Sequence, residues 1–507
     1  MSENLFTALA DGFPAAAFAR DAAGRSLSYE QLMADTARCA NALQMLGVRP
    51  GDRVAAQVEK SIDAIVLYLA TLRAGAAFLP LNPAYTTAEM EYFIGDAQPR
   101  LLVCAPEKQA TLAPIAAAGG AQLQTLGSDG MQGTLPALVA AGAPLFTDID
   151  RGADDLAAIL YTSGTTGRSK GAMLTHGNLL SNALALRDAW HCGCGDVLLH
   201  ALPIFHIHGL FVALNVTLAA GSSVRLLPRF DPELVFEHLP ACNLFMGVPT
   251  FFVRLLQDAR LNRTATAHVR LFVSGSAPLL ADTHHEWSRR TGHAILERYG
   301  MTETGINSSN PYDGERIPGT VGLPLPGTSI RVTDPESGQP LAPGATGMLE
   351  VRGPNVFAGY WRQPEKTRSE FHGDWFITGD LGRIDARGYV HIVGRGRDLI
   401  ISGGYNVYPR EIESELDSLA GVSESAVIGV PHRDFGEAVT AVVVGAGGTT
   451  SEASLLRELK ARLAGYKCPK RVLFVDALPR NTMGKVQKNV LRHTYAHLYE
   501  PGDKAST

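Results

Sequence analysis

The segment Leu156-Ala-Ala-Ile-Leu-Tyr-Thr-Ser-Gly-Thr-Thr-Gly-Arg-Ser-Lys-Gly171 joins a short apolar run to a loop rich in glycine and hydroxyl side chains. The apolar run Leu156–Leu160 predicts a buried strand, and the loop begins where this strand ends. Glycine lets backbone N–H groups come close to an anion, and serine and threonine hydroxyls add further donors. We therefore expect a phosphate-binding loop at the end of a strand.

This loop differs from the phosphate-binding loop of P-loop NTPases, in which about four residues separate two glycines and Lys then Ser or Thr follow directly. Gly164 and Gly167 are separated by only two residues. Lys170 follows Ser169 instead of a glycine, and Gly171 stands where the magnesium-binding hydroxyl would be. A P-loop NTPase is therefore not expected. Taken alone, the segment would also fit a polar turn.

A second segment, Pro479-Arg-Asn-Thr-Met-Gly-Lys485, places a lysine on a short turn near the C-terminus. A single lysine on such a turn is usually solvated. Together with a phosphate-binding loop more than three hundred residues earlier in the chain, it indicates ATP chemistry that requires two domains to meet.

Composition narrows the class of protein. The 507 residues are 46% hydrophobic, which allows a large core and more than one domain. The net charge of −5 argues against a nucleic-acid partner. Cys192-Gly-Cys194 lacks the second cysteine pair of a zinc site, so reduced thiols are expected. The sequence shows no secretory signal and no membrane span, so we expect a soluble, cytoplasmic protein with no membrane partner.

The first 310 residues alternate strand and helix signals. A capping-box pattern at Ser28 and Gln31 predicts a helix that ends at Gly47. Strands that alternate with helices favour largely parallel sheets with helices on their faces. The expected strands are Arg53–Val58, Ala76–Leu81, Arg100–Cys104, Leu156–Tyr161, Val224–Leu227, Asn243–Met246, Arg270–Val273 and Ala294–Glu297.

The sequence changes character near residue 318. Residues 318–393 are rich in Gly and Pro, with short alternating strands such as Gly347–Arg352, which predicts an antiparallel β-rich subdomain. A compact α+β pattern follows Gly394-Arg-Gly-Arg397. We therefore expect an α/β fold with a large N-terminal domain (residues 1–396) and a small C-terminal domain (residues 397–507). The expected C-terminal elements are helices at Pro409–Leu419 and Glu452–Leu463 and strands at Val422–Val430 and Ala438–Val444.

Six motifs follow one another over essentially the whole chain: YTSGTTGRSKG (161–171), GSAPL (275–279), ERYGMTET (297–304), FITGDLG (376–382), VGRGRDLIISGGYNVYPREIE (393–413) and PRNTMGK (479–485). In this order they resemble the adenylate-forming superfamily of acyl-CoA synthetases, firefly-type luciferases and peptide-synthetase adenylation domains. The resemblance implies that a carboxylate attacks the α-phosphate of ATP and expels pyrophosphate, after which a thiol displaces AMP. It also implies an N-terminal AMP-binding domain and a mobile C-terminal AMP-binding lid domain.

The same resemblance implies a site for ATP and Mg²⁺. The loop from Thr162 to Lys170 would hold the β- and γ-phosphates, and Glu303 would be the Mg²⁺ ligand. Asp380 would accept both ribose hydroxyls beside Arg395, and Tyr299 would lie against the adenine. The residues expected to bind ATP are Thr162, Ser163, Gly164, Thr165, Thr166, Gly167, Lys170, Gly275, Ser276, Ala277, Glu297, Arg298, Tyr299, Gly300, Met301, Thr302, Asp380 and Arg395.

Catalysis and coenzyme A binding are expected to involve both domains. Lys485 would bridge the attacking carboxylate and the leaving phosphates, because a compact ammonium on a long stem can reach both. Arg397 would be the hinge about which the lid rotates between the half-reactions. Acetylation of Lys485 would remove its charge, which makes a lysine acetyltransferase a candidate partner. The expected catalytic residues are Lys485, Thr302, Glu303 and His206, and Gly403, Gly404 and Tyr405 would line the coenzyme A channel.

The side chains expected around the acid are polar. An unpaired buried arginine is costly, whereas a second carboxylate on the substrate would supply its counter-charge. The open alternative is that each arginine pairs with a protein carboxylate such as Glu297 or Glu286. The residues expected to bind the substrate carboxylate are Arg254, Ser274, Ser276, Arg298 and His206, with His208, Ile306 and Asn307 also near the pocket.

Three local sequences, Gly-Val-Pro-Thr-x-x-x-Arg254, Val-Ser-Gly-Ser-Ala277 and Glu-Arg298-Tyr-Gly-Met-Thr-Glu-Thr, are similar to those of malonyl-CoA synthetases. The implied reaction joins a dicarboxylic acid, malonate or methylmalonate, to coenzyme A with ATP and Mg²⁺. Other short acids (acetate, propionate, oxalate or succinate) remain alternatives. So does a freestanding adenylation enzyme that loads a carrier protein. A nucleotide sensor without activity is not expected, because Lys485, Glu303 and Asp380 are all present.

Overall fold

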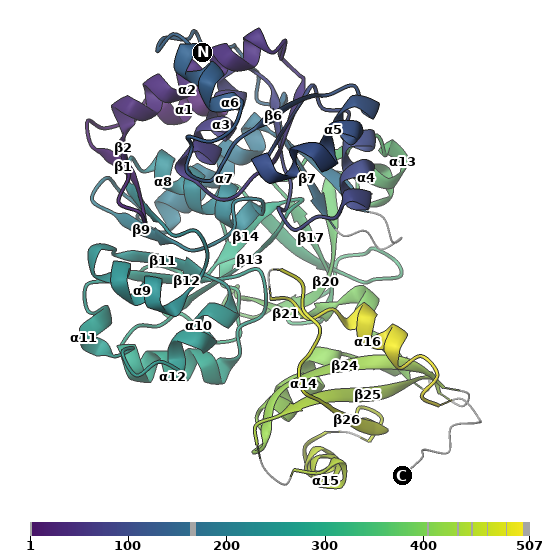
Figure 1. Cartoon of the computed structure of the whole chain (residues 1–507). Helices are drawn as coiled ribbons and strands as arrows, with labels where there is room; N and C mark the ends of the chain where they lie inside the picture. Colours follow the sequence, from purple (N-terminus) through teal and green to yellow (C-terminus); the bar gives the residue numbers. More distant parts are fainter. Residues whose placement is uncertain are drawn as a thin grey trace.

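The computed structural model describes residues 3–162, 169–402, 405–432, 435–447, 450–463, 465–482 and 484–499. The chain forms a large N-terminal part and a smaller C-terminal part, which is coloured light green to yellow and lies at the bottom of Figure 1. The large part contains mostly parallel sheets with helices on their faces, followed by an antiparallel sheet. This confirms the α/β fold class expected from the sequence, with its β-rich subdomain and small C-terminal domain.

One mostly parallel sheet comes chiefly from the N-terminal third of the chain, in the strand order β18-β8-β7-β4-β3-β5-β6. β8 runs antiparallel to β7 and brings Lys170 opposite Thr162. Neither β8 nor β18 has a counterpart among the expected strands. The strands are β3 (Arg53–Gln57), β4 (Ala77–Pro80), β5 (Leu101–Cys104), β6 (Gln122–Thr125), β7 (Leu156–Thr162), β8 (Lys170–Thr175) and β18 (Gly359–Tyr360).

A second large sheet has the order β15-β14-β13-β12-β11-β9-β10-β1-β2. Its central strands β10, β9, β11, β12 and β13 are parallel, and β14 turns back antiparallel to β13. The expected strand Ala294–Glu297 begins later and continues to Met301. The strands are β1 (Ala17–Asp21), β2 (Ser26–Ser28), β9 (Val197–His200), β10 (Ser223–Leu226), β11 (Leu244–Gly247), β12 (Leu271–Ser274), β13 (Leu296–Met301), β14 (Gly305–Ser309) and β15 (Leu323–Pro324).

Several helices of the large part begin at a side-chain cap, among them α1, α2, α3, α4 and α7. The expected capping box forms at the start of α2, where Ser28 and Gln31 each accept a hydrogen bond from the other's backbone N–H. None of the helices in the described residues is long and apolar enough to cross a membrane. The helices are α1 (Leu5–Ala10), α2 (Tyr29–Met45), α3 (Ile62–Arg73), α4 (Thr87–Ala97), α5 (Gln109–Ala118), α6 (Leu135–Ala141), α7 (His176–Ala189), α8 (Asn215–Ala219), α9 (Pro232–His238), α10 (Pro249–Leu256), α11 (Arg263–Thr266), α12 (Ala281–Thr291) and α13 (Pro364–Ser369).

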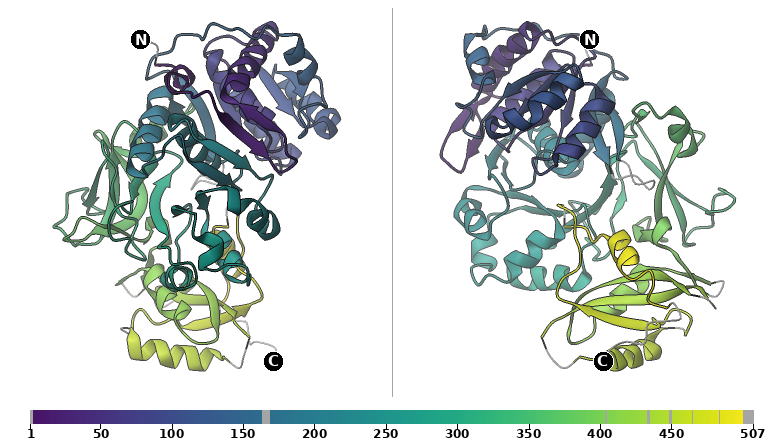
Figure 2. Two further views of the ribbon diagram at one scale, coloured as in Figure 1. Left: turned by 90° about the vertical axis from the view of Figure 1, so that its left-hand side faces the viewer. Right: turned by 45° about the vertical axis from the view of Figure 1, so that its right-hand side comes forward.

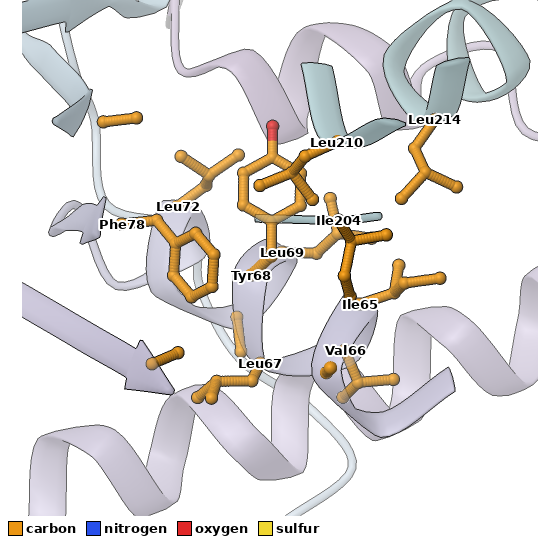
Figure 3. Packing of buried hydrophobic residues seen from close by; sticks show 14 of the residues in the cluster. Ile65, Val66, Leu67, Tyr68, Leu69, Leu72, Phe78, Ile204, Leu210 and Leu214 are labelled. Atoms are coloured by element: carbon orange, nitrogen blue, oxygen red, sulfur yellow. The ribbon is translucent and has the colours of Figure 1, made fainter. Parts of the chain in front are cut away.

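The core of the large part is centred on α3, which is buried along its whole length except at Asp63. Figure 3 shows the Tyr68 ring of this helix between Phe78 and Leu210, and its hydroxyl donates to Asn215 Oδ1 at 3.1 Å. Leu210 belongs to a π-helix (His208–Leu214) that continues directly into α8. Burial of this apolar surface fixes the loop before the π-helix, where His206 lies.

The β-rich subdomain is an antiparallel sheet with the order β16-β17-β20-β19, and β21 pairs with β20. A second small sheet, in the C-terminal part, has the order β23-β22-β25-β24 with β26 beside β25. These elements are β16 (Ser329–Thr333), β17 (Gly347–Arg352), β19 (Phe371–His372), β20 (Trp375–Ile384), β21 (Val390–Arg395), β22 (Ile400–Ser402), β23 (Tyr405–Val407), β24 (Val422–His432), β25 (Gly436–Gly445) and β26 (Arg471–Val475), with helices α14 (Pro409–Asp417), α15 (Glu452–Arg462) and α16 (Lys488–Thr494).

The C-terminal part contacts the large part through the turn before α16. Both views of Figure 2 show a yellow segment that rises from the C-terminal sheet towards the large part. A Cβ atom placed on Gly484 would lie 3.1 Å from the methyl carbon of Thr250, at the start of α10. The turn that carries Lys485 therefore touches the large part.

Candidate active site

The site lies where the parallel strands of the second large sheet end. β11 and β12 are in register, so that Gly247 stands opposite Ser274, and Ser274 in turn stands opposite Glu297 of β13. The carboxyl ends of these strands therefore share one edge, which is where open α/β sheets bind ligands. The tight turn between β13 and β14 carries Thr302 and Glu303 at this edge.

Glu303 is a buried carboxylate that extends from the β13–β14 turn to residues of β7 and β18 in the first sheet. It is 6% exposed, and its Oε1 accepts hydrogen bonds from Thr162 Oγ1 at 3.4 Å and from Tyr360 Oη at 3.0 Å. Burial raises the pKa of this carboxyl group. Both of these side-chain hydrogen bonds end on Oε1.

These residues fit a magnesium ion held together with a nucleotide. The described residues contain no cluster of three or more His, Cys, Asp or Glu side chains able to hold a metal by themselves. Mg²⁺ is commonly held by one or two carboxylates together with substrate phosphates, so the single carboxylate of Glu303 suffices.

Lys170 lies opposite Thr162, at the other end of the predicted phosphate loop. Its ammonium is 3.6 Å from Glu370 Oε1 and 4.4 Å from the centre of the Tyr360 ring. Burial lowers the pKa of Lys170. Five predicted loop residues lie outside the described residues, and their role stays a prediction: Ser163, Gly164, Thr165, Thr166 and Gly167.

The residues predicted to hold the ribose form one buried cluster. Asp380 and Arg395 are cross-strand partners in β20 and β21, and Asp380 Oδ1 lies 2.7 Å from Arg395 Nε. The hydroxyl of Tyr299 donates to Asp380 Oδ2 at 2.5 Å. This hydrogen bond fixes the position of Tyr299 relative to the residues predicted to hold the ribose. Stacking of the Tyr299 ring on adenine stays a prediction.

Arg298 is a buried cation without a counter-ion among the described residues. Its side chain is almost fully buried, and its Nε and Nη2 have no hydrogen-bond partner in that part of the chain. The guanidinium lies against Gly275, where an added Cβ would be 2.3 Å from the guanidinium carbon. Burial lowers the pKa of Arg298 to about 9. Gly275 is therefore required for Arg298 to occupy this position.

The carboxylates considered as partners for Arg298 have other partners. Glu286 pairs with Arg289 at 2.5 Å on the exposed face of α12. Glu297 accepts from the backbone N–H of Gly319 at 3.1 Å, and burial raises the pKa of its carboxyl group to about 8. Within the described residues, the alternative of a protein counter-ion therefore does not hold for Arg298.

Serine and histidine side chains surround the same region. The hydroxyl of Ser274 is buried and has no partner among the described residues. Ser276 adopts a positive φ of 70° and places its Oγ 3.2 Å from Nδ1 of His208. His206 accepts from the backbone N–H of His208 at 3.3 Å. Burial, reinforced by the charge of Arg298, lowers the pKa of His206 to about 4, so this imidazole is neutral at pH 7.

Arg254 does not share this buried environment. It is exposed in the last turn of α10, and its guanidinium lies 5.0 Å from the centre of the Phe230 ring. Thr250 lies on the same face of this helix, because residues four apart are neighbours. Arg254 is therefore on the side that the Lys485 turn contacts, and its role towards the substrate stays a prediction.

Ile306 and Asn307, which were predicted to lie near the pocket after the Glu303 turn, form hydrogen bonds with other parts of the protein. Ile306 exchanges backbone hydrogen bonds with the side chain of Asn182 at 2.8 and 3.0 Å. Asn307 Oδ1 accepts from Asn355 at 3.1 Å, and Asn355 also donates to the carbonyl of Thr304 at 2.6 Å. These contacts fix the backbone that directly follows Glu303 in the turn.

The Lys485 turn is held by contacts that the motif alone does not reveal. The backbone N–H of Lys485 donates to Asn481 Oδ1 at 2.9 Å, and the backbone N–H of Asn481 donates to the carbonyl of Lys485 at 2.9 Å. Arg480 donates to the carbonyl of Gly484 and pairs with Glu424 of β24. The lysine backbone is therefore fixed relative to the C-terminal sheet.

The predicted hinge and coenzyme A residues are only partly described. Gly403 and Gly404 lie outside the described residues, and so do the side chains of Arg397 and Tyr405. The backbone of Arg397 belongs to a short 3₁₀ turn, Gly396–Asp398, and Asp398 pairs with Arg492 of α16. The hinge and the channel stay predictions.

Comparison with known families decides the class of the protein. Residues 6–361 match the AMP-binding enzyme family, and residues 411–485 match the AMP-binding enzyme C-terminal domain. The chain belongs to the AMP-binding enzymes. The first match covers well over half of the chain, and the second contains the turn that ends at Lys485.

Several relatives of this AMP-binding enzyme cover nearly the whole chain. A feruloyl-CoA synthase from Amycolatopsis sp is 37% identical over 93% of this chain and 94% of its own length. A malonate–CoA ligase from Arabidopsis thaliana is 34% identical over 92% and 84%. The ATP-bound crystal structure of MatB from Rhodopseudomonas palustris is 61% identical, covers 99% of this chain and 100% of its own, and has a TM-score of 0.97. The apo form of the same protein gives 0.86.

Several site residues were not predicted from the sequence. Tyr360, Glu370, Asn355 and Asn481 each contact a predicted site residue, which for Asn355 is Asn307. Asn481 lies within a recognised motif, so its position could have been noticed. The others follow the Gly- and Pro-rich boundary of the β-rich subdomain, where no periodic pattern marks a functional side chain.

Proposed function

We propose that this AMP-binding enzyme joins malonate, or methylmalonate, to coenzyme A through an acyl-adenylate. One carboxylate of the diacid attacks the α-phosphate of ATP and expels pyrophosphate. The thiol of coenzyme A then attacks the acyl carbon and displaces AMP. The support from relatives is the 61% identity to MatB and the 34% identity to a malonate–CoA ligase, each over more than nine tenths of this chain.

The observation that carries the choice of acid is the buried guanidinium of Arg298, which has no counter-ion among the described residues. A second carboxylate on the substrate would neutralise this charge and accept hydrogen bonds from its Nε and Nη2. Ser274, whose buried hydroxyl lacks a partner in the described residues, offers a further donor. A monocarboxylic acid would leave both groups unsatisfied, which costs free energy in a buried site.

The side chains around the ATP site would each contact one part of the nucleotide or its metal ion. Glu303 would hold Mg²⁺, which supplies positive charge to the phosphates in the adenylation step. Lys170 and Thr162 would contact the phosphates, and Asp380 with Arg395 would bind the ribose hydroxyls. Gly300, Met301, Thr302 and Ala277 would line the nucleotide through their backbone, because they lie at the end of β13 or in the loops at the same sheet edge.

Lys485 would act in the first half-reaction. Support comes from the contact between Gly484 and Thr250, which brings the Lys485 turn onto the large part. The higher TM-score against ATP-bound MatB (0.97) than against the apo form (0.86) agrees with a lid arrangement suited to adenylation. For the second half-reaction, we propose rotation about Arg397 at the boundary of domains 1–396 and 397–507, with Gly403, Gly404 and Tyr405 then lining the thiol path.

The alternatives differ in the acid or in the acceptor. A relative named feruloyl-CoA synthase shares 37% identity, but a large apolar acid would leave Arg298 without a counter-charge. A carrier protein in place of coenzyme A is a second alternative. A cytoplasmic location and acetylation of Lys485 by a lysine acetyltransferase stay proposals; acetylation would remove the charge needed for adenylation.

A substrate panel tests the proposal. Purified protein with ATP, Mg²⁺ and coenzyme A would be offered malonate, methylmalonate, succinate, oxalate, propionate, acetate and ferulate, with pyrophosphate release and thioester formation both measured. We expect malonate or methylmalonate to give the highest kcat/KM. A higher value for ferulate or propionate than for malonate would reject the diacid assignment.

A further inference from the structure

Tyr360 contacts two of the residues assigned to the phosphates and the metal, although it belongs to neither of their loops. It is 4% exposed, and its hydroxyl donates to Glu303 Oε1 at 3.0 Å. The ammonium of Lys170 lies 4.4 Å from the centre of its ring. A single side chain therefore contacts a carboxylate at its polar tip and a cation on its apolar face.

The backbone around Tyr360 is held from both sides of the site. Tyr360 pairs with Ala172 in the β18–β8 ladder, and its N–H donates to Thr367 Oγ1 at 2.9 Å. Nearby, the N–H of Phe357 donates to the carbonyl of Glu303 at 2.8 Å. The segment thus links the strand that begins at Lys170 with the turn that carries Glu303.

We propose that Tyr360 is a positioning residue, which fixes the Glu303 carboxylate for Mg²⁺ and holds Lys170 towards the phosphates. This inference rests on the proposed role of Glu303 as the magnesium ligand. The hydroxyl donates to Oε1 and so restricts the orientation of the carboxylate that would bind the cation. A glutamate without this bond would sample other rotamers, and metal binding would have to order it.

The ring makes a separate contribution. A cation over an aromatic face is attracted by the ring quadrupole, and this attraction strengthens when water is excluded. Lys170 is almost fully buried, and its other described counter-charge, Glu370, is shared with Lys366 at 2.5 Å. Glu370 alone therefore does not fix the position of the Lys170 ammonium. The Tyr360 ring adds the second contact that does.

The test separates the hydroxyl from the ring. Tyr360→Phe removes only the hydroxyl, whereas Tyr360→Leu removes the ring as well. Thermal unfolding would be followed with ATP over a magnesium titration, without acid and without coenzyme A. For Tyr360→Phe we expect the half-saturating magnesium concentration to rise about tenfold, as for loss of a hydrogen bond to a charged group. For Tyr360→Leu we also expect a higher ATP requirement, because Lys170 is released.

Tyr29→Phe is the matched control. Tyr29 is equally buried, and its hydroxyl donates to the carbonyl of Ser222 at 2.7 Å, away from the phosphate loop. The control should lose comparable stability without nucleotide but keep the wild-type magnesium requirement. An unchanged requirement in Tyr360→Phe, or the same change in both variants, would overturn the inference. So would equal stabilisation of the wild type by ATP with and without Mg²⁺.

This experiment is independent of the acid that the enzyme uses. If the wild type rejects malonate in the substrate panel, the proposed substrate fails, and the magnesium titration with ATP alone still decides the role of Tyr360. Pyrophosphate exchange with the preferred acid then gives a second measurement. We expect Tyr360→Phe to raise the KM for ATP at limiting magnesium and to leave the KM for the acid unchanged.

Discussion

Gly484 lies against Thr250, so that the turn carrying Lys485 touches the first turn of α10. A Cβ on Gly484 would stand 3.1 Å from the Thr250 methyl carbon, closer than side chains normally pack, and Gly484 has a positive φ of 73°. Arg254 follows Thr250 by one helical turn on the same face. In this arrangement of the two parts, the Lys485 turn therefore lies on the side of α10 where Arg254 is exposed.

Gly484→Ala should weaken adenylation by obstructing this contact. Gly447→Ala is the control, because Gly447 has a similar φ of 82° but no atom within 4 Å of an added Cβ. Both variants carry the same backbone strain, and only one meets Thr250. We expect pyrophosphate exchange to fall about tenfold in Gly484→Ala and to stay near the wild-type rate in Gly447→Ala. Similar losses in both would show that closure does not depend on this contact.

Lys485→Ala should separate the two half-reactions. The ammonium is proposed to stabilise charge that develops only while the carboxylate attacks ATP, so its loss affects that step. We expect acyl-adenylate formation to fall by a factor of about a hundred or more, while supplied malonyl-AMP is still converted to malonyl-CoA. The two rates would be measured by pyrophosphate exchange and by thioester formation. Equal loss of both would contradict the assignment.

Arg298→Met should abolish the use of malonate and make the free protein more stable. The wild-type site keeps a guanidinium out of water with no described counter-charge, and an apolar side chain of similar length removes that penalty. We expect the free energy of unfolding without substrate to rise by about 1–4 kcal/mol. Thermal unfolding and malonate kinetics would be measured on the same variant. Lower stability in the variant would indicate a partner that balances the charge.

Arg254→Ala tests a residue that the sequence assigned to the same carboxylate. In the structure it is exposed and stacked on Phe230, 5.0 Å from the ring centre. If it turns towards the diacid when the lid closes, its loss should raise the KM for malonate and relax the preference towards propionate. Unlike Arg298→Met, the variant should not gain stability, because an exposed guanidinium carries little desolvation cost. Unchanged malonate kinetics would leave Arg298 as the carboxylate-binding residue.

The fold could be predicted from the sequence because its signals are local. The helix starting after Ser28 and the strand Arg53–Gln57 follow from caps and apolar runs that depend on few neighbours. β8 was missed because Lys170 to Thr175 carries mixed polarity and pairs antiparallel beside a loop. Its strand character comes from the partner strand rather than from its own residues.

The site could be predicted only in part, for a similar reason. Motifs indicated Glu303 and Asp380, and the partners Thr162, Tyr299 and Arg395 lie in motifs as well, but the partner Tyr360 lies in a segment with no motif of its own. Tyr360 meets Glu303 because β18 leaves the β-rich region and pairs with β8 of the first sheet. Likewise, the sequence could not decide whether Arg298 has a counter-ion, because that depends on which carboxylates fold near it. Here Glu297 binds a backbone N–H instead.

His176 should make the large part sensitive to acid. It is fully buried at the start of α7, and its Nδ1 accepts from the backbone N–H of Leu5 at 2.9 Å. Burial, together with the charge of Arg151, lowers its pKa to about 4, while nearby Asp155 opposes the shift. Between the folded pKa and the ordinary value of about 6.5, the unfolded chain binds the extra proton. Stability is therefore lost as the pH falls through this range.

His176→Asn should remove this loss, because the amide oxygen can still accept from Leu5 but does not titrate. We expect the wild type to lose about 2 kcal/mol more than the variant between pH 7 and pH 5, from the folded and unfolded pKa values. Urea unfolding followed by tryptophan fluorescence would measure this difference. All four tryptophans precede residue 397, so the signal reports the large part alone. Other groups titrate in both proteins and cancel, so equal losses would mean that His176 is protonated in the folded protein.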